Sequence, residues 1–154
     1  MRNRFRDGLG CSLPRWGECM LEGLMGDWLF ERQIDGHGSM SGDASFTLTE
    51  SGAALYREAG VWRLDSGESL PARQSYLYEA VAGGFAVRFV ESGELFHRVL
   101  LVQDGDVLRG EAEHLCGADF YASTYEIGGD GFAVRHRVKG SRKDYVMRTV
   151  YRRA

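Results

Sequence analysis

From residue 27 onward, apolar and polar residues alternate with a period of two, which is typical of β-strands with one buried face. Trp28, Phe30 and Ile34 share one such face, together with Arg32. Further segments of this kind follow at short intervals, separated mostly by glycine, aspartate and serine. The pattern predicts about ten strands, within residues 28–34, 44–48, 55–58, 61–64, 74–81, 85–90, 95–102, 107–115, 120–127, 132–139 and 145–153.

The connections between these segments indicate how the strands are arranged. Most hold two to four residues, whereas a parallel crossover needs about a dozen or more. A break is expected at Ala59–Gly60 and a longer loop at Asp65–Pro71. An antiparallel meander of this size buries its apolar face by closing on itself. We therefore predict an all-β fold, an antiparallel up-and-down β-barrel, with a two-sheet sandwich as the alternative.

One helix is predicted ahead of the strands. An apolar stripe at helical spacing runs through residues 16–25, formed by Trp16, Met20, Leu21 and Leu24. The stripe ends at Gly26, and we expect the short helix to plug one end of the barrel. Residues 1–15 are expected to form a disordered N-terminal segment, and residues 16–154 a single domain.

Composition and charge exclude several classes of protein. The 154 residues are 44% hydrophobic and 27% charged, which indicates a folded domain rather than a disordered chain. The net charge of −3 leaves no basic field to hold a nucleic acid. No apolar run approaches the ~18 residues of a membrane-spanning helix, and no signal-peptide core follows the basic start. We expect neither a nucleic-acid nor a membrane partner.

The cysteines bear on the compartment. Cys11, Cys19 and Cys116 form an odd set without a CxxC pair, which favours a reducing environment. A cytoplasmic location is therefore predicted. We also expect no cofactor. The sequence leaves the oligomeric state open, a dimer included.

The inward face of each strand follows from parity, because alternate side chains face the same way. Arg109, Glu111 and Glu113 occupy one face of their strand, so His114 and Cys116 are predicted to point inward. The same rule gathers further polar aromatic side chains on inward faces, namely Tyr76, Tyr78, Tyr121, Tyr125, His136, Tyr145 and Tyr151.

Two explanations account for so many inward tyrosines and histidines. They form either a satisfied core network or the lining of a cavity that orients a small ligand. We favour the cavity, because the small residues Gly110 and Ala112 leave volume near His114. The predicted ligand is a partly polar aromatic or amphipathic molecule. The apolar wall of the cavity would comprise Trp28, Phe30, Phe46 and Phe89. The polar contacts to the ligand would come from Tyr76, His114, Cys116, Tyr121, Tyr125, Tyr145 and Tyr151. Arg142 and Lys143 would lie at the rim of the cavity.

Other functions use some of the same residues. In an isomerase or hydrolase, His114 would be the general base, oriented by Asp119, with Tyr121 or Tyr145 as the acid. In a haem- or metal-binding barrel, His114 and Cys116 would supply two ligands, where a zinc site needs three or four. Of the other histidines, His97 is expected to form a hydrogen bond at a loop end and His37 to be solvated.

Short motifs resemble a known superfamily. Gly26-Asp27-Trp28 resembles the Gly-x-Trp start of the lipocalin and fatty-acid-binding (calycin) barrels. Residues 113–121 and 138–145, with Phe96-His97, resemble lipocalin-like domains of unknown function. The resemblance runs from about residue 26 to residue 153.

The resemblance implies a barrel with an internal cavity, closed at its base by Arg153 over the ring of Trp28. It supplies no substrate. We expect no counterpart of the disulfides common in secreted lipocalins. The axial-histidine motif of haem-binding, nitrobindin-like relatives does not align with His114 or His136.

Overall fold

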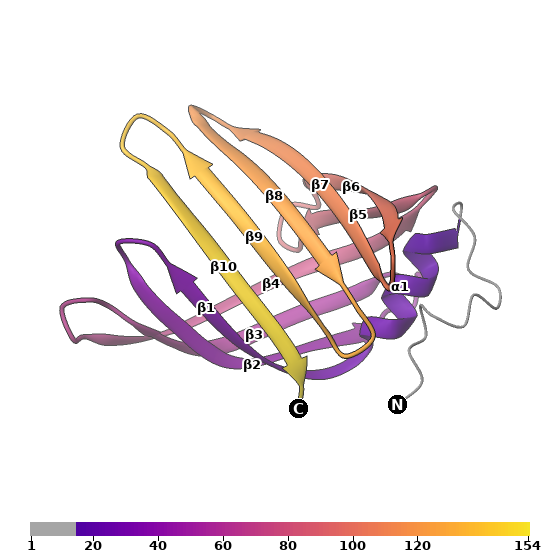
Figure 1. The fold of residues 1–154 in the computed structure, drawn as a ribbon, viewed down its shortest axis with the longest axis horizontal. Coiled ribbons are helices and arrows are strands. Elements are labelled where there is room, and N and C mark those ends of the chain that lie inside the picture. The colour runs from indigo at the N-terminus through magenta and orange to yellow at the C-terminus, as the bar shows by residue number, and fades with distance from the viewer. Residues whose placement is uncertain (1–14) are drawn as a thin grey trace.

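The computed structural model describes residues 15–154, so the expected N-terminal segment lies outside the described residues, except for Arg15. The described chain consists of one helix followed by ten strands (Figure 1). Their bounds are α1 (Trp16–Leu24), β1 (Gly26–Ile34), β2 (Gly38–Leu48), β3 (Ala54–Arg63), β4 (Ser69–Val81), β5 (Gly84–Phe89), β6 (Leu95–Asp104), β7 (Val107–Cys116), β8 (Asp119–Ile127), β9 (Gly131–Lys139) and β10 (Asp144–Arg153).

The ten strands form a closed antiparallel barrel in which each strand pairs with its neighbour in sequence. The first and last strands close the barrel, with Trp28 opposite Arg153 and Phe30 opposite Tyr151. Closure pairs the backbone N–H and C=O groups that the edge strands of an open sheet would expose. The predicted fold class is confirmed, and the sandwich alternative is excluded.

Helix α1 lies at one end of the barrel, while strands β1–β4 and β7–β10 diverge toward the other end (Figure 1). The helix contacts β4 and β5, and a Cβ atom on Gly17 would overlap the carbonyl oxygen of Gly84. The absence of a side chain at Gly17 therefore allows this close approach. Among the described residues, no helix is long and apolar enough to cross a membrane.

The α1 end is also fastened by a stacked pair. The guanidinium of Arg153 lies 3.9 Å from the centre of the Trp28 ring. It donates hydrogen bonds to the carbonyl oxygens of Gly23 and Met25. The indole of Trp28 donates to the carbonyl oxygen of Leu24 at 2.8 Å. This end of the barrel is thus tied to the last turn of α1.

Two expectations about the strands were wrong. The chain does not break at Ala59–Gly60, because Gly60 lies within β3, directly opposite Gly42 of β2. A Cβ atom on Gly42 would overlap the backbone of Ala59, so these glycines serve close strand packing rather than a turn. The expected loop at 65–71 is shorter than predicted, since β4 begins at Ser69. Pro71 is tolerated there because β4 pairs with β5 only through residues 76–81.

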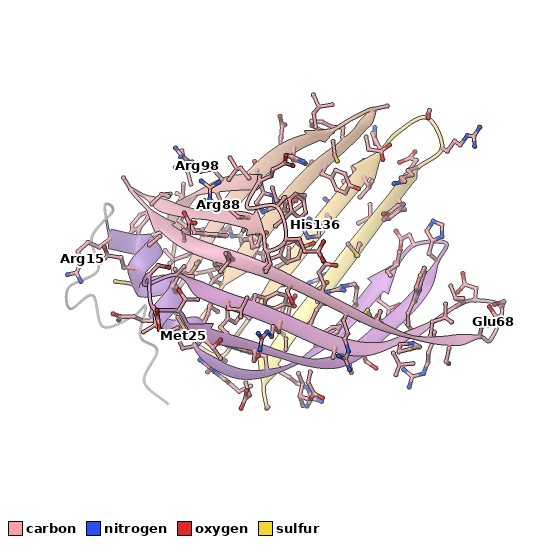
Figure 2. All side chains as sticks on the ribbon, turned by 180° about the vertical axis from the view of Figure 1, so that it is seen from behind. Arg15, Met25, Glu68, Arg88, Arg98 and His136 are labelled. Carbon is pink, nitrogen blue, oxygen red and sulfur yellow. The ribbon has the colours of Figure 1, made fainter. Side chains whose placement is uncertain are left out.

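The core fills the end of the barrel next to α1. Its rings pack in sequence: Trp28 meets Phe132 edge-on at 5.0 Å, and Phe132 stacks on Tyr151 at 4.0 Å between ring centres. The outer face carries charged side chains together with exposed apolar ones such as Leu100 and Val102. Figure 2 shows Arg98 outside the barrel and His136 within it. Trp28, Phe30 and Phe46, predicted to line a ligand cavity, are instead part of this packed end.

Cys19 on α1 is disulfide-bonded, whereas Cys116 at the end of β7 is a free, exposed thiol. The expectation that the chain has no disulfide is therefore wrong at Cys19. The cysteine count by itself does not decide the compartment.

Candidate functional site

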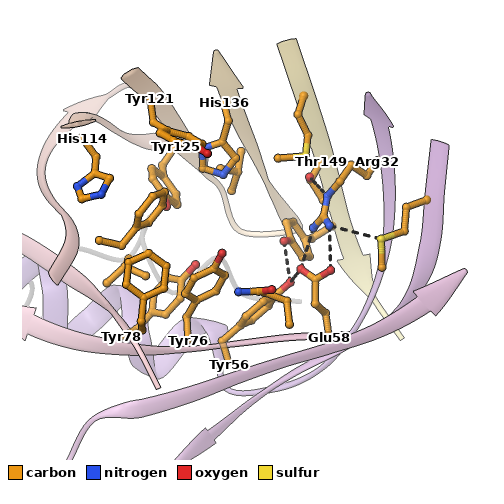
Figure 3. A pocket seen from close by; sticks show the side chains of 18 of the residues that line it. Arg32, Tyr56, Glu58, Tyr76, Tyr78, His114, Tyr121, Tyr125, His136 and Thr149 are labelled. Atoms are coloured by element: carbon orange, nitrogen blue, oxygen red, sulfur yellow. Dashed lines mark hydrogen bonds and ion pairs between the residues drawn. The ribbon is translucent and has the colours of Figure 1, made fainter. Parts of the chain in front are cut away.

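The barrel interior holds a cavity of about 440 Å³, to which all ten strands contribute side chains. Tyr76 and Tyr78 point into it from β4, and they face His114, Tyr121 and His136 across the space (Figure 3). Because inward residues alternate along each strand, polar and apolar side chains meet in one chamber.

The apolar wall centres on Phe96 at the start of β6. Its ring stacks with Tyr76, with centres 6.0 Å apart, and lies 5.3 Å from the ring of Phe89. The imidazole of His114 meets Phe96 edge-on at 5.1 Å. This wall therefore presents aromatic faces and edges to whatever occupies the cavity.

A buried ion pair forms the opposite, polar wall. Arg32 of β1 donates from Nη1 and Nη2 to the two carboxylate oxygens of Glu58 on β3, each at 2.8 Å. Its Nε donates to Oγ1 of Thr149 at 2.7 Å. Only 13% of the Arg32 side chain and 4% of the Glu58 side chain are exposed. Burial would lower the pKa of Arg32, but the bonds to Glu58 outweigh it and the pKa is raised.

Two tyrosines extend this network toward the core. The hydroxyl of Tyr56 donates to Oε1 of Glu58 at 2.8 Å and shares a 2.8 Å hydrogen bond with the hydroxyl of Tyr151. Burial raises the pKa of Tyr151 to about 12 and also raises that of Tyr56. Both hydroxyls are therefore protonated at neutral pH, and the network holds one positive and one negative charge.

Two more histidines lie near the cavity, of which His136 lines it and the buried His97 does not. Nε2 of His97 lies 2.6 Å from the hydroxyl of Tyr125, and Nδ1 of His136 lies 2.6 Å from Oγ of Ser123. Burial, followed by the neighbouring His136 and His114, lowers the pKa of His97 to about 3. Burial, followed by Arg32, lowers the pKa of His136 to about 4. Both rings are neutral at pH 7.

Sequence and structure comparisons identify the family. Residues 24–153 match a family of unknown function, DUF6314. The chain belongs to the DUF6314 family. The matched region contains all ten strands.

Among solved structures, this DUF6314 barrel is similar to that of Rv2717c from M. tuberculosis, with a TM-score of 0.63 and 15% sequence identity. The similarity covers 87% of this chain and 94% of the other. At this identity it shows the fold alone. No curated protein matches the sequence.

Six of the predicted ligand-binding residues line the cavity of this DUF6314 member: Tyr76, His114, Cys116, Tyr121, Tyr125 and Tyr151. Tyr145 does not line it, and its ring instead packs edge-on against His37, with centres 5.2 Å apart. Lys143 donates to Asp119 at 3.0 Å, and Arg142 is exposed; neither lines the cavity. These three residues lie on the β9–β10 turn or at the adjoining start of β10, beyond the chamber.

Two interpretations of the sequence were wrong in their details. Gly110 does not make room for a ligand, because the side chain of Val99 already occupies the position that a Cβ atom would take. His97 is not a loop-end residue but a buried one, 2% exposed, inside β6. Val87 pairs with His97 but Arg88 pairs with Leu95, so Phe96 is an extra residue in β6 at a register shift, which obscures parity at this point.

Arg32 and Glu58 were not predicted as site residues. Arg32 shares the strand face of Trp28 and Phe30, and Glu58 shares that of Tyr56. The sequence did contain a signal for this pair. A cation lies on the buried face of one predicted strand and an anion on the buried face of another, and such residues are rarely buried unless they pair.

The arrangement offers little support for the predicted catalytic group. Among the described residues, no hydrogen bond joins His114 to Asp119, whose carboxylate accepts from Lys143. The centres of the His114 and Tyr121 rings lie 6.3 Å apart. The described residues also contain no group of three or more His, Cys, Asp or Glu side chains that could hold a metal ion.

Proposed function

We propose that this protein is a small-molecule-binding barrel of the calycin type, which takes a partly polar aromatic or amphipathic ligand in its interior. The observation that carries the proposal is the cavity of about 440 Å³ with one aromatic and one polar wall. Its volume lies within the range of about 300–1,000 Å³ that small-molecule sites occupy. The Gly26-Asp27-Trp28 start, with Arg153 over Trp28, supports the calycin assignment.

A satisfied core network accounts for only part of the interior. It explains why Arg32, Glu58, Tyr56 and Tyr151 are bonded to one another. It does not explain why a chamber remains between Tyr76 and His136 when protein interiors are otherwise close-packed. A ligand that stacks on the aromatic wall and reaches the polar groups would fill this volume. The cytoplasmic location also stays a proposal.

Titration with the fluorescent probe N-phenyl-1-naphthylamine tests this function, because its emission rises in an apolar site. We expect saturable binding at one site per chain. Ala72 lines the cavity, so Ala72→Trp should fill part of it and weaken binding by about tenfold or more. Ala59 lies on the adjacent strand and is exposed, so Ala59→Trp is the matched control and should bind as the wild type does. Equal binding by both variants, or no saturable binding by the wild type, would contradict the proposal.

A further inference from the structure

The buried pair of Arg32 and Glu58 determines the charge that the cavity presents to a ligand. In a site built for a carboxylate, the guanidinium fork would face open space and await the ligand. Here both arms of the fork already bind Glu58, at 2.8 Å each, and Nη1 also contacts Sδ of Met40 at 3.6 Å. Nε is held by Thr149. The position that a ligand carboxylate would take is thus occupied by the protein's own carboxylate.

Glu58 is held as firmly as Arg32. Its side chain is 4% exposed, and its Oε1 accepts a second hydrogen bond from Tyr56 at 2.8 Å. An anionic ligand beside this pair would meet the repulsion of Glu58 together with the attraction of Arg32. The two contributions largely cancel, and the cost of removing the anion from water would remain uncompensated.

No other cation of the lining is placed to replace Arg32. Arg73 lines the cavity from β4 but is exposed, so solvent screens its charge. His136 is neutral at pH 7 because burial lowers its pKa to about 4. His114 is partly exposed near the free thiol of Cys116, where water also reaches it. Lys143, beyond the lining, is engaged by Asp119.

We infer that the cavity takes an uncharged aromatic ligand with hydrogen-bonding groups and discriminates against its carboxylate or sulfonate analogues. This inference rests on the proposed function and adds the class of ligand. The groups that recognise such a molecule are the ring of Tyr76, which stacks with Phe96, and the side chains of Tyr121 and His136 opposite (Figure 3). Tyrosine hydroxyls and a neutral imidazole donate to or accept from amide, phenol or heteroaromatic groups without requiring a charge.

The test compares two probes that differ by one sulfonate, N-phenyl-1-naphthylamine and 1-anilinonaphthalene-8-sulfonate, at pH 7. We expect the wild type to bind the uncharged probe about tenfold or more tightly than the anion. Glu58→Gln leaves Arg32 with an unbalanced charge, so the ratio of the two affinities should shift by about tenfold toward the sulfonate. Glu79→Gln removes a partly exposed carboxylate that pairs with Arg88, and its ratio should match the wild type.

Near-UV circular dichroism establishes that each variant is folded. If Glu58→Gln does not fold, the double variant Arg32→Met/Glu58→Gln, which removes both charges, should still prefer the uncharged probe. A wild type that binds the sulfonate as tightly as the uncharged probe would overturn the inference and leave the proposed function standing. An unchanged ratio in folded Glu58→Gln would also overturn it, because the pair would then not set the selectivity. Failure of the wild type to bind either probe would instead contradict the proposed function.

Discussion

Replacing Arg32 by methionine should destabilise the barrel far more than removing a surface arginine. The substitution keeps an unbranched side chain but leaves the carboxylate of Glu58, only 4% exposed, without its two hydrogen bonds from the guanidinium. Breaking a buried pair from one side costs about 3–5 kcal/mol. With a urea dependence of about 2 kcal/mol per molar, the unfolding midpoint should fall by roughly 2 M.

Urea unfolding followed by tryptophan fluorescence measures this change. The matched control is Arg88→Met, because Arg88 pairs with Glu79 at 3.2 Å with both side chains more than a third exposed. That substitution should cost less than about 1 kcal/mol. The double variant Arg32→Met/Glu58→Gln should recover about half or more of the loss, since no buried charge is left unpaired. A cost for Arg32→Met no larger than for Arg88→Met would refute the role given to this pair.

Three further predictions concern other parts of the barrel. The pKa of His97 is lowered to about 3 from 6.5, so the unfolded chain binds a proton that the folded chain does not, and stability should fall as the pH drops below 6.5. Urea titrations between pH 6.5 and 5 measure the slope of unfolding free energy against pH, and His97→Gln should reduce that slope by about 1 kcal/mol per pH unit. The control His37→Gln, at an exposed position, should leave the slope unchanged. Gly110→Ala should lower the thermal midpoint, at a cost of about 1–3 kcal/mol, because the new methyl would overlap Val99; a midpoint equal to the wild type would show that the strands have room. Arg153→Ala should lower the free energy of unfolding, measured with urea, by about 2–3 kcal/mol, because it removes the stacking on Trp28 and two hydrogen bonds to carbonyl oxygens at the end of α1. A loss below about 0.5 kcal/mol would show that Arg153 does not fasten this end of the barrel.

The fold was largely predictable because alternation and short turns leave an antiparallel meander few options. The errors arose where a residue type has more than one structural use. Gly60 can end a strand or permit close packing, and only its partner Gly42 across the sheet decides between them. Pro71 can lie in a loop or on an unpaired strand edge, and the extent of the β4–β5 pairing decides that case.

The sequence predicted which strand faces point into the barrel, but not how far along the barrel axis each inward residue lies. Parity identified the inward side of β7–β10, and His114, Tyr121 and Tyr125 do line the cavity. Parity does not say how far along the barrel axis an inward residue lies, so Tyr145 was grouped with them although it packs against His37. Parity also does not show whether a neighbouring side chain fills the space beside a small residue, as the side chain of Val99 fills the space beside Gly110.

A crystal structure of the protein with N-phenyl-1-naphthylamine would reveal whether an uncharged aromatic molecule occupies the barrel interior. We expect density for the probe inside the cavity, with a ring against Tyr76 or Phe96 and its amine toward Tyr121 or His136, while the pair of Arg32 and Glu58 stays intact. A probe bound only on the outer surface, or side chains that close the cavity and leave no space, would contradict it.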